Sequence, residues 1–246
     1  MTERLNRFLA HSGIASRREA DRLIAGGFVN VNGRMAPAAG RLIDPELDRI
    51  EVEGRPIEPI PDRRWLAFHK PAGVVVTSRD PQGRTTVLDL LPPEHQARRL
   101  YPVGRLDAET TGLLLVTDDG ELANRVQHPK HKVAKEYLAT VRGVPGEGDL
   151  RRLRQGIELS DGVTQPAEVQ LLSSRGQYSQ LRVTLREGRN RQIRRMFAAV
   201  GHPVEGLTRE AFGPIRLGRL HPGGWRRLRP SELKALREAA DLAVDT

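Results

Sequence analysis

The sequence predicts an α+β protein in which a small helix-turn-helix plus β-hairpin domain precedes a mixed, mainly antiparallel sheet with flanking helices. The first ~60 residues combine two short helical patterns with an Asn-Gly turn. The remainder holds several apolar, strand-like runs with few helical segments between them. Because regular βαβ winding needs a helix between successive strands, this scarcity of helices favours a mainly antiparallel sheet.

The N-terminal segment contains the signals of two helices and a hairpin. Leu5, Phe8 and Leu9 follow the i, i+3, i+4 spacing of a helix, and Ser16 with Glu19 forms a capping box for a second helix. The run FVNVNGRM alternates around an Asn-Gly hairpin turn, and IEVEGRPI gives a second short strand and turn. Together these predict one compact unit.

A proline-rich stretch separates this unit from the rest of the chain. Residues 56–62, PIEPIPD, contain three prolines in seven and predict a linker. We therefore expect an N-terminal domain over residues 1–60 and a second domain over residues 63–246. The second domain offers WLAF, LLLVT, KEYLATV, AEVQLL and QLRVTL as strands, with a further strand expected over residues 73–77.

Composition favours a polyanionic partner and removes several chemistries. The 246 residues contain 40 Lys and Arg against 31 Asp and Glu, for a net charge of +9. The absence of cysteine excludes disulfides, thiolate nucleophiles and cysteine-based metal sites. With no signal-peptide pattern and no apolar run of ~18 residues, we expect a cytoplasmic protein without a membrane partner.

Arginine is concentrated in the two N-terminal helices. Five arginines fall within 19 residues there, which favours a phosphate-binding face over an ordinary solvated one. The segment RLNRFLAHSGIASRREADRLIAGGFVNVNGR resembles the S4-like RNA-binding domain. This resemblance implies that Arg17, Arg18 and Arg22 grip the RNA backbone.

The segment EGRNRQIRRMF predicts a helix with one apolar stripe. Ile193, Met196 and Phe197 recur at helical spacing, which is typical of core rather than of a cofactor box. Arg191 projects away from this stripe, whereas Arg194 falls on its flank, where a half-buried guanidinium can reach a pocket.

Metal and nucleotide cofactors are not indicated. His128 and His131 flank a proline but lack further ligand spacing and stand among lysines, which disfavours a metal. No phosphate-binding loop or dinucleotide-binding spacing is present. We expect an activity that needs no cofactor.

Asp107, in the segment GRLDAETTGLLLVTDDGELA, is the carboxylate of greatest interest. By itself it is typical of a loop residue whose side chain bonds nearby backbone. Together with HKPAGVVVTS, KEYLATV and EGRNRQIRRMF, however, the segment resembles the bacterial ribosomal-RNA pseudouridine synthases of the RsuA/RluB group. The resemblance implies a cofactor-independent uridine-to-pseudouridine isomerase, nearer the large-subunit branch, with Asp107 as its catalytic carboxylate.

The same resemblance implies roles for four further residues. Arg194 falls at the position of the family's basic partner, and Tyr137 at that of the ring that packs on the target uracil. Taken alone, Tyr137 is more typical of an ordinary tyrosine in the core of a strand. Ile193 matches the apolar pocket position. Arg105 either enters the space left by the extruded base or contacts a phosphate, and both alternatives stay open.

Five further cations are expected along the RNA approach: Lys70, Lys130, Lys132, Arg189 and Arg191. The carboxylate could attack the ribose, attack uracil C6 or remove the C2′ proton.

Two other functions compete with the isomerase. One is a non-catalytic RNA-binding or ribosome-assembly factor on the same fold, and the other is a base-excising glycosylase. The partner expected for the isomerase is ribosomal RNA or an assembly intermediate, bound by a monomer.

Overall fold

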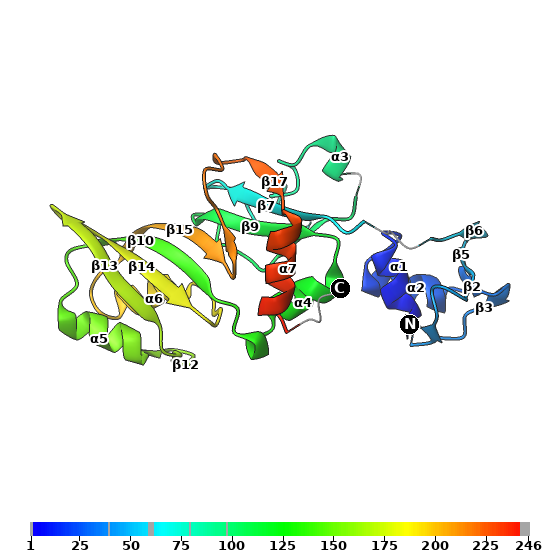
Figure 1. The fold of residues 1–246 in the computed structure, drawn as a ribbon, viewed down its shortest axis with the longest axis horizontal. Helices are drawn as coiled ribbons and strands as arrows, with labels where there is room; N and C mark the ends of the chain where they lie inside the picture. Colours follow the sequence, from blue (N-terminus) through cyan, green and yellow to red (C-terminus); the bar gives the residue numbers. More distant parts are fainter. Residues whose placement is uncertain (1, 39, 59–61, 79, 97, 242–246) are drawn as a thin grey trace. The chain divides into compact units, whose positions relative to one another are not determined.

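The computed structural model describes residues 2–38, 40–58, 62–78, 80–96 and 98–241, which form two compact units. The N-terminal unit comprises Met1–Arg64, Ala97–Arg99 and Asp118–Gly120. The C-terminal unit comprises Trp65–Gln96, Leu100–Thr117 and Glu121–Thr246 (Figure 1). The middle of the expected linker, residues 59–61, lies outside the described residues.

The N-terminal unit has the predicted helix pair and hairpin. Its helices are α1 (Leu5–His11) and α2 (Arg17–Ala25), and the Ser16 hydroxyl accepts a bond from the Glu19 amide at 3.2 Å. A four-stranded sheet has the order β3-β2-β5-β6, with bounds Arg34–Met35, Val29–Val31, Ile50–Val52 and Arg55–Pro56. A separate pair joins β1 (Glu3–Arg4) to β4 (Leu42–Ile43).

The C-terminal unit is built on a nine-stranded sheet whose main path runs β13-β14-β10-β15-β9-β7-β17. These strands span Glu168–Arg175, Tyr178–Leu185, Lys135–Arg142, Val204–Phe212, Thr111–Thr117, Trp65–Lys70 and Trp225–Arg227. Off this path, β8 (Tyr101–Val103) pairs with β9, and β16 (Ile215–Arg216) pairs with β15. All these pairs are antiparallel except β9 with β15, so the predicted mainly antiparallel fold is confirmed.

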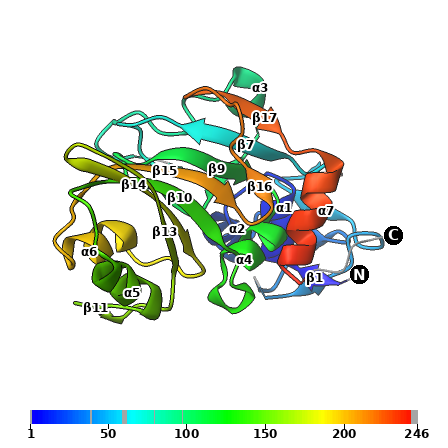
Figure 2. The ribbon, with the colours of Figure 1, turned by 60° about the vertical axis from the view of Figure 1, so that its left-hand side comes forward.

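Helices cover the two halves of this sheet separately. On one half, α5 (Glu147–Gln155) and α6 (Gln192–Ala198) lie together and share a core with β10, β13, β14 and β15 (Figure 2). On the other half, α4 (Gly120–Gln127) and α7 (Pro230–Ala239) lie side by side and pack with β7, β8 and β9. Ile193, Met196 and Phe197 of α6 are buried, which confirms that their stripe is core.

Three short elements complete the unit. A four-residue helix, α3, spans Pro93–Gln96, the 3-10 turn η1 spans Pro129–His131, and a small hairpin joins β11 (Glu158–Leu159) to β12 (Gly162–Val163). The expected strand over residues 73–77 is wrong, since only Val75 forms a bridge, to Thr86. Gly73, with a φ of +82°, breaks the extended backbone there. None of the helices in the described ranges is long and apolar enough to cross a bilayer.

The parallel pairing of β9 with β15 fixes where the Asp107 loop stands. Thr111 pairs with Thr208, and Gly112 pairs with Arg209. Gly112 has a φ of +103°, and a Cβ there would come within 2.6 Å of the Arg209 amide nitrogen. Glycine is therefore required at the start of β9, where the backbones approach closely. As a result, the loop before β9 ends against the middle of β15.

Candidate active site

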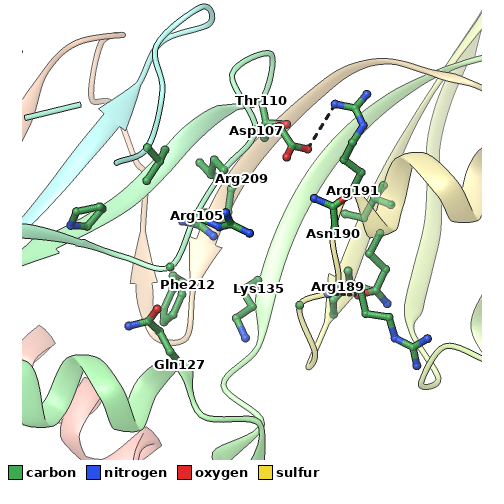
Figure 3. Close-up of a pocket in the computed structure, with 18 of the residues that line it drawn as sticks. Arg105, Asp107, Thr110, Gln127, Lys135, Arg189, Asn190, Arg191, Arg209 and Phe212 are labelled. Carbon is green, nitrogen blue, oxygen red and sulfur yellow. Dashed lines mark hydrogen bonds and ion pairs between the residues drawn. The ribbon is translucent and has the colours of Figure 1, made fainter. Parts of the chain in front are cut away.

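A pocket of about 940 Å³ opens in the C-terminal unit. Its lining includes the loop before β9, the start of β10, the second half of β15 and the loop before α6, and Figure 3 shows side chains from these segments around one opening. Residues 75–78, Tyr101 and Gln127 also line it. The sheet order places β10, β15 and β9 side by side, so the fold brings these distant sequence segments together.

Asp107 lines this pocket, and its carboxylate is paired with Arg191. Oδ2 of Asp107 lies 3.8 Å from Nη1 of Arg191, the contact dashed in Figure 3, and the Asp107 side chain is 32% exposed. Arg191 has a left-handed backbone, with a φ of +46°, directly before α6 begins. Its other terminal nitrogen, Nη2, lies 3.6 Å from Oε2 of Glu109. Arg191 therefore links two carboxylates of the Asp107 loop.

Arg194, expected as the basic partner of the site, lies largely buried on α6 and contacts the Asp107 loop at Glu109. Its Nη2 lies 3.6 Å from Oε2 of Glu109, and its Nη1 donates to the Val204 carbonyl at 3.0 Å. Arg194 thus reaches the Asp107 loop through Glu109, whereas Arg191 is the arginine paired with Asp107 itself. Helical geometry explains the difference: Arg191 stands at the N-cap, where its left-handed backbone frees it from the helical spacing used for the prediction.

Tyr137 and Ile193 both line the pocket, from β10 and α6 respectively. Tyr137 is half-buried, and its Cα pairs with that of Arg209 across the β10–β15 ladder. Side chains at directly paired positions point to the same face of a sheet, so Arg209 accompanies Tyr137 toward the pocket. Ile193 is only 3% exposed.

Lys70 was expected on the RNA approach, but its side chain is completely buried. Its ammonium donates to the carbonyls of Pro71 at 2.9 Å, Ala108 at 2.9 Å and Thr110 at 2.8 Å. Two of these acceptors flank Glu109 in the Asp107 loop. Lys70 therefore fastens the Asp107 loop through these hydrogen bonds, and its buried ammonium is not available to bind RNA.

The Arg189 guanidinium, also expected on the approach, is occupied by the β11–β12 hairpin. It donates to the carbonyls of Asp161, Gly162 and Val163 and pairs with Glu187 at 3.2 Å. Although it lines the pocket, its donors serve to fasten the hairpin beside α6.

The remaining predicted cations are exposed. Arg105 lines the pocket, whereas Lys130 and Lys132 belong to the turn that leads into β10. In the N-terminal unit, Arg17, Arg18 and Arg22 are exposed on α2, and Arg22 pairs with Glu19 at 3.1 Å.

Two cations in the pocket wall, Lys135 and Arg209, were not anticipated as site residues. Lys135 stands two residues before Tyr137, so strand alternation alone would have placed both on one face. Arg209 carried no comparable signal, because its place depends on the register of β15 against β10 and β9.

The structure predicts that Lys70→Met loosens the Asp107 loop, because three carbonyls lose their donor. We expect the free energy of unfolding to fall by about 1–3 kcal/mol, measured by urea denaturation, with exposed Lys234→Met as the matched control. An unchanged unfolding midpoint in Lys70→Met would contradict the assigned role.

The pH dependence gives the same variant a second measurement. Burial lowers the pKa of Lys70 from 10.5 to about 8, against the opposing attraction of Asp107. Between those pH values the unfolded chain binds more protons than the folded one, so folding becomes more favourable as the pH rises. The stability difference between wild type and Lys70→Met should therefore increase across this interval.

Comparisons with known proteins agree with this arrangement. A family model described as RNA pseudouridylate synthase matches residues 64–199, and one described as an S4 domain matches residues 3–47. An uncharacterized RNA pseudouridine synthase from Aquifex aeolicus is 43% identical over 243 residues, which cover 98% of this chain and 96% of that protein. Ribosomal large subunit pseudouridine synthase B from Bacillus subtilis is 44% identical over 244 residues, 97% of each protein.

A solved structure supports the same assignment. The crystal structure of a pseudouridylate synthase is 32% identical, superposes with a TM-score of 0.68, and covers 95% of this chain and 99% of its own. The matched family segment spans the pocket residues Asp107, Tyr137 and Arg191 of this chain. This chain therefore belongs to the RNA pseudouridylate synthase family, with an S4 domain preceding the synthase segment.

Proposed function

We propose that this uridine isomerase acts at a specific position of large-subunit ribosomal RNA, with Asp107 as its catalytic carboxylate. One observation carries the assignment: Asp107 is the aspartate in the wall of a pocket whose volume, about 940 Å³, can accommodate a nucleotide. The name of the Bacillus subtilis relative supports the large subunit as the source of the RNA. Such a substrate implies action in the cytoplasm.

The reaction breaks the bond between C1′ of the ribose and N1 of uracil and rejoins C1′ to C5 of the same base. A carboxylate can serve this exchange as a nucleophile or as a base. Arg191, at 3.8 Å, orients the Asp107 carboxylate from one side. Lys70 restrains the Asp107 loop by donating hydrogen bonds to the carbonyls of Ala108 and Thr110. No step of this exchange requires a nucleotide cofactor.

Tyr137 and Ile193 supply the surface on which the detached uracil turns over. The half-buried Tyr137 ring offers a stacking face, and stacking of a base on an aromatic ring is worth about 1–3 kcal/mol. Ile193 closes the apolar side of the pocket. Arg194 contributes one step further away, since it holds Glu109, which in turn pairs with Arg191.

Removing the target base from its stack costs a few kcal/mol, and contacts to neighbouring RNA can offset that cost. We propose that Arg17, Arg18 and Arg22 supply such contacts in the N-terminal domain, residues 1–60, for the synthase domain, residues 63–246. The exposure of these arginines on one helix supports this role. Lys130, Lys132 and Arg105 extend the cationic path near the pocket. We further propose that the protein acts as a monomer.

The central test is tritium release from large-subunit rRNA transcripts labelled at C5 of uridine. Because C5 loses its hydrogen when it bonds to the ribose, release reports the isomerisation directly. Asp107→Asn, which keeps the shape of the side chain but removes its charge, should reduce release by at least ~10³-fold. Glu147→Gln makes the same chemical change on the exposed surface of α5 and should match the wild type.

Release that persists in Asp107→Asn would remove Asp107 from the chemistry. If wild type and Asp107→Asn both bound the RNA without releasing tritium from any transcript or assembly particle, an RNA-binding assembly factor would be favoured instead. Free uracil in the products would indicate a glycosylase.

A second prediction concerns the N-terminal arginines. Replacing Arg17, Arg18 and Arg22 together by Gln should weaken rRNA binding and make its log affinity fall less steeply with log salt. Each lost phosphate contact reduces the slope by about 0.7–0.9, so the triple change should reduce it by roughly 2. Equilibrium binding over a salt series measures this. An unaltered slope, in a variant that still folds, would rule out the anchoring role.

A further inference from the structure

Two cations on one side of the pocket share an aromatic ring. Lys135 Nζ lies 5.5 Å from the centroid of the Phe212 ring, and the Arg209 guanidinium carbon lies 5.3 Å from the same centroid. All three residues line the pocket, and Lys135 pairs with Phe212 across the β10–β15 ladder (Figure 3). The pocket therefore contains two positive charges built into neighbouring strands of its rigid sheet.

Arg209 is held in an unusual state for an arginine. The residue is only 3% exposed, and its Nε donates to the Leu113 carbonyl at 2.7 Å. Its Nη2 is buried and, within the described part of the chain, has no acceptor. A buried guanidinium with an unpaired donor is expensive to maintain. The unpaired Nη2 thus points to an acceptor that the described residues do not supply.

Three other arginines around the opening are neutralised by carboxylates. Arg191 pairs with Asp107 and Glu109, Arg189 with Glu187, and Arg186 with Glu168. By contrast, among the described residues no carboxylate lies within 4 Å of Lys135 or Arg209. The positive charge of Arg209 adds to burial in lowering the pKa of Lys135 to about 8. On the Asp107 side of the pocket the arginine charges are therefore paired with carboxylates. On the Phe212 side, among the described residues, the charges of Lys135 and Arg209 are not.

We propose that Lys135 and Arg209 form a phosphate subsite that binds the phosphodiester adjacent to the target uridine. The neutral oxygens of uracil would leave both charges uncompensated, whereas a phosphodiester is fully ionised and offers several acceptors. The guanidinium of Arg209 can offer a directional hydrogen bond to a phosphate oxygen, and the ammonium of Lys135 can add a compact positive charge beside the same phosphate. Arg105, which also lines the pocket, extends this side toward solvent.

This subsite rests on the proposed function and adds a geometric element to it. Phosphate contacts fix the register of a nucleic acid without reading its sequence. A phosphate fixed against β10 and β15 would set the position of the attached ribose relative to Asp107, on the opposite side of the same pocket. Lys135 and Arg209 are then positioning residues, which act on the RNA backbone and not on the bonds that break.

The test is phosphate ethylation interference on an unmodified large-subunit rRNA transcript, which identifies each phosphate whose charge is needed for binding. In the wild type, we expect interference at a phosphate flanking the uridine that the enzyme converts. In Lys135→Gln that signal should disappear, affinity should fall about 10- to 100-fold, and the salt slope should decrease by about 0.7–0.9. Lys135→Arg should restore the signal, and exposed Lys234→Gln should leave it unchanged.

Two results would overturn the subsite. One is the same interference pattern in Lys135→Gln as in wild type. The other is a fall in the turnover number of Lys135→Gln with affinity and salt slope unchanged, which would indicate a role in the chemistry. Failure of the proposed function has a different signature, since a flanking signal that depends on Lys135 could persist even if no uridine were converted. Arg209→Lys, checked for folding, gives an independent second variant.

Discussion

The parallel contact between β9 and β15 is the constraint on which the site depends. Gly112 and Arg209 pair so closely that a side chain at residue 112 would meet the Arg209 backbone. This contact ends the Asp107 loop against β15, whose other neighbour is β10 with Tyr137 and Lys135. Lys70 then fixes the loop by donating to the carbonyls of Ala108 and Thr110. Backbone geometry therefore positions the carboxylate, and the side chains refine its surroundings.

The charges of the pocket are distributed according to the same framework. Asp107, Arg191, Glu109 and Arg194 form a chain of ion pairs between the loop and α6. Lys135 and Arg209, on the sheet, have no such partners among the described residues. A pocket that neutralises its charges on one side only is suited to a substrate that carries both a reactive nucleoside and a negatively charged backbone.

Much of the fold follows from local sequence signals. The helix pair, the Asn-Gly hairpin and the buried stripe of α6 depend on short-range spacing, and each forms as predicted. Residues 73–77 do not form a strand, since their backbone makes only one isolated bridge, from Val75 to Thr86. Their apolar composition alone therefore gave a wrong prediction. The pairing of β9 with β15 could not be predicted, since parallel pairing between strands almost a hundred residues apart has no local signal in the sequence.

Residues of the site could be predicted only where they lie in sequence motifs. Asp107, Tyr137 and Ile193 were found through family resemblance, and all three line one pocket. The position of Arg191 beside Asp107 depends on one left-handed backbone, and the burial of Lys70 depends on tertiary packing. Neither feature leaves a mark in residue spacing. Arg209 escaped notice for the same reason.

From this arrangement we expect a uridine to enter the pocket with its ribose facing Asp107. A crystal structure of Asp107→Asn bound to an unmodified large-subunit rRNA fragment tests it most directly. We expect one extruded uridine with its base against Tyr137 and its C1′ next to residue 107. RNA bound to the protein with its uridines outside the pocket, or with the ribose turned away from residue 107, would contradict the claim.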